Sequence, residues 1–229
     1  TKHLIEELKH ENVESFQVPG FENAVQLEEK KNVFLTSAFK DGFFEVQDAG
    51  SQKIGEFLDV KPGMRVVDAC AGAGGKTLHL AALMENKGQI IAMDIHGWKL
   101  AELKRRAKRA GAHNIETREI TDNKVIKRLH EKADRLLIDA PCSGLGVLKR
   151  NPDSKWKIDQ DFIDRIRKEQ ETILQDYSKI IKKGGKMVYA TCSILPSENN
   201  EQVENFLKNN PDFKLVKEEK VMPSTGFDG

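Results

Sequence analysis

Two of the three cysteines stand at equivalent places in the chain, each directly after an apolar run. Cys142 follows "RLLIDAP" and Cys192 follows "KMVYAT". If these runs are neighbouring strands of a parallel sheet in the order 3-2-1-4-5, their carboxyl ends meet, and the two thiols converge in the crevice where such sheets bind ligands. A buried thiol most often serves packing alone. Two thiols at matching strand ends favour covalent chemistry, in which the thiolate is the nucleophile.

A glycine-rich turn, "DACAGAGGKT" at 68–77, follows the earlier apolar run "MRVV". A triphosphate loop needs a glycine where the chain has Cys70, and a dinucleotide fingerprint needs one where it has Thr77. The third candidate ligand is S-adenosylmethionine, whose carboxylate and amino groups can lie against the backbone of such a turn at a helix N-terminus. We therefore expect S-adenosylmethionine as the cofactor, with Cys70 packing or contacting it through the backbone.

Three aspartates end or follow the expected strands. Asp94 ends "IIAMD", about 20 residues beyond the glycines, the interval expected for an acid that binds ribose hydroxyls. Asp122 follows the third strand and could address the adenine edge, and Asp139 ends the fourth. All three would lie at the ligand-binding edge of the sheet. The alternative for Asp94 and Asp122 is that they only cap the helices that follow.

A thiol beside a methyl sulfonium suits methylation of a pyrimidine at carbon 5. That carbon is a poor nucleophile until a thiolate adds at carbon 6, after which it can attack a methyl group in line. A base then removes the carbon 5 proton, and the thiol is eliminated. Lys76 is a candidate to lower the pKa of the thiol, and Asp139 could contact the N3 and exocyclic amine edge of cytosine.

The elements needed to position these residues can be placed from the alternation of apolar runs and amphipathic segments, which predicts a parallel sheet wound with helices. We expect strands at 64–69, 89–95, 115–120, 134–140 and 186–191, and helices near 75–86, 97–110, 123–131 and 159–183, the last ending at the glycines of "KKGGK". A helix from Ser197 and a sixth strand at "FKLVKE" follow. The fold class is α/β and Rossmann-like, at residues 61–229.

Residues 1–60 read differently and predict a small, partial α+β lobe. We expect an opening helix, short extended pieces around "ESFQV", "AVQL" and "NVFL", and a helix at "SQKIGEFLDV" that leads into the sheet.

Composition limits the possible partners. Lysine and arginine total 37 against 36 acidic residues, so no global field draws the protein to nucleic acid. Basic residues gather locally in "WKLAELKRRAKRAG" and "LKRNPDSKWK". The first segment is either a solvated helix face or an RNA contact, and the sequence leaves both alternatives open. No apolar run approaches the roughly 20 residues of a membrane helix, and no secretory signal is recognisable. We expect a cytoplasmic protein with no metal, since no cysteine pair has zinc-site spacing.

The motifs "FEVQDAGSQ", "DACAGAGGKT", "DAPCSGLGVLKRNPDSKWK" and "YATCSILPSENN" closely resemble the RNA cytosine-5 methyltransferases of the Sun/NOL family, especially the bacterial ribosomal RNA enzymes. The resemblance implies that Cys192 is the nucleophile and that Cys142 assists product release. It implies RNA as the partner, with ribosomal RNA as the first candidate. We expect the basic residues Lys149 and Arg150 to hold its phosphates. The cofactor residues that it implies are Cys70, Ala71, Gly72, Ala73, Gly74, Gly75, Lys76, Asp94, Asp122 and Asp139.

The chain departs from the family pattern in three places. Ala73 stands where the family usually has proline, and Thr121 precedes Asp122 where it usually has glycine. The chain also stops at "STGFDG", where the family continues into a final strand that would complete the sheet.

Several other functions compete with this interpretation. A DNA cytosine-5 methyltransferase would use Cys142 as the nucleophile, but its E-N-V tripeptide occurs here only at 11–13, ahead of the turn. A P-loop ATPase would use Asp139 to organise magnesium, against which Cys70 counts. A transfer RNA substrate, or an RNA-binding module with a relic cofactor pocket, would fit the same motifs.

Overall fold

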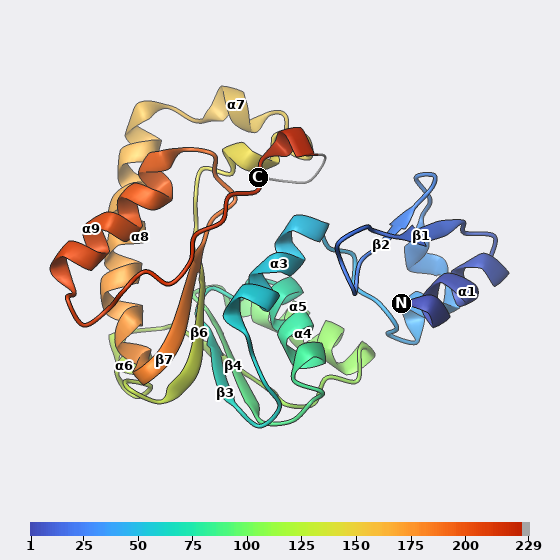
Figure 1. Cartoon of the computed structure of the whole chain (residues 1–229), viewed down its shortest axis with the longest axis horizontal. Coiled ribbons are helices and arrows are strands. Elements are labelled where there is room, and N and C mark those ends of the chain that lie inside the picture. Colours follow the sequence, from blue (N-terminus) through green and yellow to red (C-terminus); the bar gives the residue numbers. More distant parts are fainter. Residues whose placement is uncertain (226–229) are drawn as a thin grey trace.

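The computed structural model describes residues 1–225, and its centre is a parallel sheet of five strands (Figure 1). Their spatial order is β5-β4-β3-β6-β7, which is the predicted order 3-2-1-4-5. The α/β Rossmann-like class is therefore confirmed. The strands are β3 (Arg65–Asp68), β4 (Gln89–Asp94), β5 (Ile115–Glu119), β6 (Ala133–Asp139) and β7 (Ile181–Ala190).

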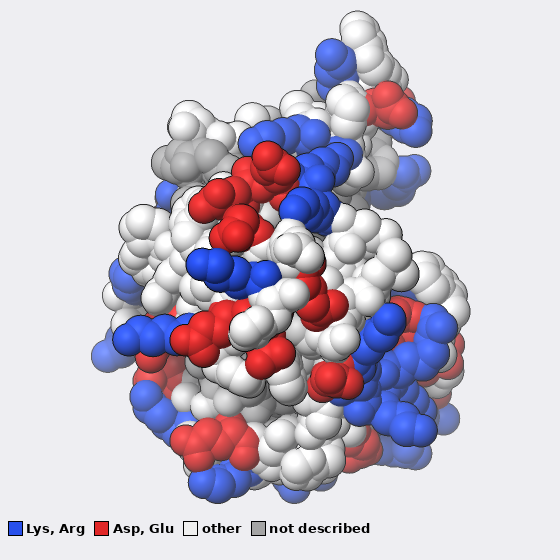
Figure 2. All heavy atoms as spheres, turned by 90° about the vertical axis from the view of Figure 1, so that its right-hand side faces the viewer, with Lys and Arg blue, Asp and Glu red and all other residues white. Residues whose placement is uncertain are grey.

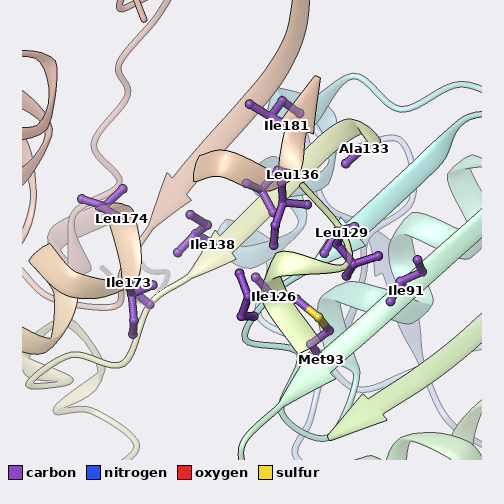
Figure 3. Close-up of a cluster of buried hydrophobic side chains, with 14 of the residues drawn as sticks. Ile91, Met93, Ile126, Leu129, Ala133, Leu136, Ile138, Ile173, Leu174 and Ile181 are labelled. Atoms are coloured by element: carbon purple, nitrogen blue, oxygen red, sulfur yellow. The ribbon is translucent and has the colours of Figure 1, made fainter. Parts of the chain in front are cut away.

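The central strands are apolar on both faces because helices cover both sides of the sheet. Alternate residues of a strand point to opposite faces, so neighbouring valines of β3 serve different cores. Val67 packs with α6 (Asn123–Lys127), α8 (Gln160–Tyr177) and α9 (Asn200–Asn209), as Figure 3 shows for part of this cluster. Val66 packs with α3 (Ala49–Leu58) and α4 (Gly75–Leu83) on the other face, where α5 (Gly97–Arg109) also lies.

The N-terminal segment forms a small unit at one side of the sheet (Figure 1). It contains α1 (Lys2–His10), an antiparallel pair of β1 (Ser15–Gln17) and β2 (Val25–Leu27), a 3₁₀ turn at Val33–Leu35, and α2 (Ser37–Lys40). Its own core is built on Leu8, Val13, Val33 and Ala38. The extended piece expected at "NVFL" is wrong, because the side chain of Asn32 accepts from the backbone N–H of Phe34 and starts the 3₁₀ turn.

Two further expectations along the sheet are wrong. The helix expected at 159–183 ends at Tyr177, and β7 already begins at Ile181 because the N–H groups of Glu131 and Lys132 pair with the carbonyls of Lys179 and Ile180. The glycines that were to stop the helix instead lie in an irregular part of β7, where Gly184 has a φ of +76°.

The sixth strand expected at "FKLVKE" is also absent from residues 1–225. Leu215 and Val216 are largely exposed there, while Phe213 packs edge-on against Phe206. The expectation about the very end of the chain, at 226–229, lies outside the described residues. Within residues 1–225, no helix is both long and apolar enough to cross a membrane.

Candidate active site

Cys142 and Cys192 meet at the carboxyl edge of the sheet, with their sulfur atoms 3.2 Å apart. β6 and β7 pair in parallel up to Asp139 and Ala190, so the loops that follow leave the sheet side by side. The backbone N–H of Gly146 donates to the carbonyl of Cys192 at 2.9 Å, and that of Cys192 donates to the Cys142 sulfur at 3.3 Å. The structure thus brings together the two thiols that the sequence placed at equivalent strand ends.

The two thiols differ in their environment. The pKa of Cys192 is lowered, first because the Cys142 thiol donates a hydrogen bond to its sulfur, and Lys76 adds a favourable charge. The pKa of Cys142 is raised, because it shares that hydrogen bond as donor and because it is more buried. Cys192 is also the exposed member of the pair. The geometry therefore favours a thiolate at Cys192 and a protonated thiol at Cys142.

Lys76 and Asp139 form an ion pair beside the thiols. The Nζ atom of Lys76 lies 2.7 Å from Oδ2 of Asp139, and both side chains are less than one-third exposed. Burial alone would lower the pKa of Lys76, but the charge of Asp139 and its hydrogen bond outweigh burial and raise that pKa. Lys76 therefore stays a cation whose charge acts on the Cys192 thiol, and it pairs with Asp139 through Oδ2.

The glycine-rich turn links the end of β3 to the start of α4. Gly72 and Gly74 have φ values of +54° and +90°, which favour glycine. A Cβ atom on Gly74 would lie 2.5 Å from the Leu103 side chain, so glycine is also needed for packing against α5. A Cβ atom on Gly72 or Gly75 would meet no atom within 4 Å. The turn therefore offers open backbone at a helix N-terminus, which fits the carboxylate and amino groups of S-adenosylmethionine.

The side chain of Asp94 fixes this turn through a hydrogen bond to its backbone. Its side chain is buried, Oδ2 accepts from the N–H of Gly72 at 2.9 Å, and Oδ1 accepts from the N–H of His96 at 2.8 Å. Asp94 thus lies at the carboxyl edge of the sheet and braces the glycine turn, and its contact with the cofactor ribose stays a prediction. Asp122 is exposed and caps α6, because its side chain accepts from the N–H of Lys124 at 2.7 Å. This contact is the one expected if Asp122 caps the helix, which was the alternative to a role in cofactor binding.

The other predicted residues lie around this edge. Cys70 is packed against the core beneath the sheet edge, and burial raises the pKa of its thiol. Lys149 and Arg150 lie exposed in the loop between β6 and α8, near the short helix α7 (Ser154–Lys157). In the same segment Trp156 is 80% exposed, with Nζ of Lys155 4.9 Å from its ring centroid.

Two buried acids in the site escaped the sequence analysis. Asp68, at the end of β3, is fully buried and accepts from the hydroxyl of Thr77 at 2.7 Å, and burial raises its pKa to about 7. Glu198, six residues after Cys192, is also fully buried and accepts from residues of both cysteine loops. Both acids belong to motifs quoted above: Asp68 opens the glycine-rich motif at a strand end, and Glu198 lies in the "SEN" of the second cysteine motif. These positions were the available signals.

The basic helix α5 is divided between structural and exposed residues. Arg106 and Arg109 pair with Glu45, which belongs to the segment leading out of the N-terminal unit. Lys104, Arg105 and Lys108 are exposed. On the face seen in Figure 2, basic and acidic side chains are mixed over most of the surface, and basic side chains gather in one cluster at the lower right.

A parallel sheet of this order, with a glycine turn after its first strand and an acid after its second, defines a Rossmann-like methyltransferase domain. Residues 56–226 match the family model described as 16S rRNA methyltransferase RsmB/F. The chain belongs to this family. The resemblance to the Sun/NOL group is confirmed, and the prediction of S-adenosylmethionine is confirmed at the level of the family.

Curated and solved relatives give the same assignment. The chain is 36% identical over 212 residues to the probable ribosomal RNA small subunit methyltransferase B of Bacillus subtilis, covering 92% of this chain and 47% of that protein. A solved methyltransferase homolog from Pyrococcus horikoshii superposes with a TM-score of 0.79 at 31% identity, over 91% of this chain and 66% of the other. NSun6 from the same organism, solved with SFG, gives 0.72 and 30%, over 81% and 48%. The chain thus spans about half the length of the curated relative.

Proposed function

We propose that the protein methylates carbon 5 of a cytosine in ribosomal RNA through a covalent cysteine adduct, with Cys192 as the nucleophile. The observation that carries this proposal is the 3.2 Å contact between the Cys142 and Cys192 sulfurs beside the Lys76–Asp139 ion pair. Such a pair supplies a thiolate and a proton-bearing thiol at one place, which addition and elimination both require. The family match supports RNA as the substrate. A cytoplasmic location follows from that substrate and is proposed with it.

The chain's residues have distinct parts in this reaction. Cys192 thiolate forms a bond from sulfur to carbon 6, and the electron pair of the carbon 5–carbon 6 double bond makes carbon 5 nucleophilic. Asp139 faces the N3 and exocyclic amine edge and favours this addition, while Lys76 stabilises the thiolate before it. S-adenosylmethionine, when bound at the glycine turn, supplies the methyl group. A base takes the proton from carbon 5, the carbon–sulfur bond breaks, and Cys142 assists release of the methylated base.

The target base must leave its stack to reach the thiols, as enzymes that act on bases generally require. The segment with Lys149, Arg150 and Trp156 leads directly from the Cys142 loop, and we expect it to hold the RNA around that base. Phosphate contacts from the basic residues fix the position of the RNA but do not read its sequence.

A trapping experiment tests the division of roles between the cysteines. The unchanged protein, Cys142→Ala, Cys192→Ala and the double variant are incubated with S-adenosylmethionine and unmodified ribosomal RNA, then separated on a denaturing gel. We expect a slowly migrating RNA adduct to accumulate only in Cys142→Ala, because release is then impaired while the nucleophile remains. The double variant is the matched control.

The other outcomes identify the error. An adduct that needs Cys142 would reverse the roles of the two thiols. An adduct formed with transfer RNA and not with ribosomal RNA would keep the chemistry but change the substrate. Tight binding of RNA and cofactor with neither adduct nor methyl transfer would support the relic module instead.

A further inference from the structure

The two cysteine loops have the same local structure. Both read Cys-Ser-x-Leu, at 142–145 and at 192–195. In each loop the serine hydroxyl accepts from the backbone N–H two residues later, at 3.4 Å from Leu145 and 3.2 Å from Leu195. This local turn orients each serine toward the protein interior, where both are buried, while the preceding cysteine faces the site.

One carboxylate joins the two turns. Oε1 of Glu198 lies 2.5 Å from the hydroxyl of Ser143 and 2.6 Å from that of Ser193. The two hydroxyls are themselves 3.1 Å apart. Oε2 of Glu198 accepts from the backbone N–H of Ser143 at 2.8 Å. The residue directly after each cysteine is therefore bound to the same buried side chain.

Glu198 is itself held by neighbouring elements. Its Oε2 also accepts from Nε2 of Gln170 on α8 at 3.0 Å, and the same amide donates to the carbonyl of Pro141 at 2.9 Å. The hydroxyl of Tyr189 on β7 donates to the backbone carbonyl of Glu198 at 2.8 Å. Glu198 and Gln170 have no exposed surface, so water does not compete for these bonds. We call Glu198, with its partners Ser143, Ser193 and Gln170, the clamp. The clamp is rigid because α8, β7 and both cysteine loops contribute to it.

We propose that Glu198 is a positioning residue that fixes the separation and orientation of the Cys142 and Cys192 sulfurs by binding both following serines with one carboxylate. This inference deepens the proposed function, because it names what aligns the nucleophile with its partner thiol. Glu198 does not touch either sulfur. It acts through Ser143 and Ser193, and its effect is therefore visible in the behaviour of the thiols even without RNA.

Glu198→Gln is the sharpest variant, because it keeps the shape and replaces one acceptor oxygen by an amide donor. The remaining oxygen faces the two N–H donors of Ser143 and Gln170, so the amide nitrogen faces the two hydroxyls. The hydroxyl protons then lose their common charged acceptor. The amide N–H groups can replace these bonds only by donating to serine oxygens that already accept from Leu145 and Leu195, so the link between the two turns is weakened. Glu201→Gln on α9 is the matched control, since it removes the same charge from an exposed neighbouring position.

Two readouts on the full chain, without RNA, follow the thiols. The first is oxidation by diamide, which takes two electrons and two protons from Cys142 and Cys192 as they form a disulfide. The second is the pH profile of Cys192 alkylation by iodoacetamide, followed by mass spectrometry. We expect Glu198→Gln to form the disulfide about tenfold more slowly, and its alkylation profile to move to higher pH, because each sulfur loses its partner. If it methylates RNA, its kcat falls about 100-fold, the cost of a misplacement of about 1 Å.

Unchanged thiol behaviour in a folded Glu198→Gln protein would overturn the inference, whatever the variant does to methylation. Equal changes in Glu201→Gln would also overturn it, because they would reflect charge alone. If Glu198→Gln does not fold, Ser143→Ala and Ser193→Ala each remove one half of the clamp. Slower disulfide formation in both supports the inference, and normal formation in both refutes it. Failure of methylation in the unchanged protein, with normal thiol behaviour, would count against the proposed function only.

Discussion

The guanidinium of Arg106 donates a hydrogen bond to the backbone carbonyl of Ala73, with 2.8 Å between nitrogen and oxygen. The same side chain pairs with Glu45 at 2.9 Å, so α5 connects the glycine turn to the segment leading from the N-terminal unit. Ala73 stands where the resemblance to the Sun/NOL family leads us to expect proline. A side-chain contact here restrains a turn that lacks the restraint of a proline ring.

Replacing Arg106 by alanine should therefore weaken cofactor binding, because the turn loses the bond that orders it before the ligand arrives. We expect the Kd for S-adenosylmethionine to rise about tenfold, which corresponds to about 1.4 kcal/mol. Isothermal titration calorimetry measures this change. Lys108→Ala, an exposed residue on the same helix, is the control. Equal weakening in the control would mean that overall charge, and not the turn, is responsible.

Lys76 and Asp139, which form an ion pair, should change the reactivity of the Cys192 thiol in opposite directions. The positive charge of Lys76 lowers the pKa of Cys192, whereas the negative charge of Asp139 raises it. Lys76→Met should therefore move the alkylation profile of Cys192 to higher pH, and Asp139→Asn should move it to lower pH. Because thiolate is the reactive form, the first variant reacts more slowly at neutral pH and the second faster. Shifts in the same direction would contradict this account.

Asp68 should make the protein less stable as the pH rises. Burial raises its pKa from 3.8 to about 7. Below pH 3.8 both the folded and unfolded states hold the proton, and between the two values only the folded state holds it. The free energy of unfolding therefore falls across this interval, by up to about 4 kcal/mol, and levels off above it.

Asp68→Asn removes this dependence. Urea unfolding at pH 5 and pH 8 measures the free energy of unfolding of both proteins. The difference between the variant and the unchanged protein should shift in favour of the variant from pH 5 to pH 8. Asp161→Asn, at an exposed position, should show no such gain. A difference between Asp68→Asn and the unchanged protein that is the same at both pH values would refute the assignment.

The exposed segment around α7 should contribute to RNA affinity. Trp156 is 80% exposed beside Lys155, an arrangement suited to stacking on an unpaired base. Trp156→Ala should weaken RNA binding by about 1–3 kcal/mol, and Trp156→Phe should restore much of it. Lys149→Ala should lower the salt dependence of binding by about one phosphate contact. Filter binding at several salt concentrations measures both, and unchanged cofactor affinity shows that the domain is intact.

The sheet and the meeting of the thiols were predictable because both depend on strand ends. Parallel strands place their carboxyl ends at one edge, so a residue that follows an apolar run is located once the strand order is known. This locates Asp94, Asp139, Cys142 and Cys192 from the sequence alone. The glycine turn is equally local, since Gly72 and Gly74 adopt positive φ values that few other residues tolerate.

The parts that escaped prediction depend on contacts between distant segments. Glu198 follows Cys192 by six residues, but its partners Ser143 and Gln170 come from other elements. Arg106 could not be separated from its exposed basic neighbours, because its partner Glu45 lies in the segment before α3. The start of β7 at Ile181 was missed because pairing with the segment after α6 overrides the stop signal of the two glycines.

The paired ends of β6 and β7 divide the chain into two regions that differ in how well they tolerate insertions and substitutions. Cys142 and Cys192 are 50 residues apart, yet their positions are set by strand register and by the clamp at the loop bases. The stretch carrying α7 departs from this fixed base and returns to it through α8. We expect residues near α7 to be inserted or exchanged without moving the sulfur atoms. One extra residue between Asp139 and Cys142, in contrast, would shift the Cys142 sulfur out of its contact with the Cys192 sulfur. The outer loop can therefore change in length and composition while the two thiols keep their spacing.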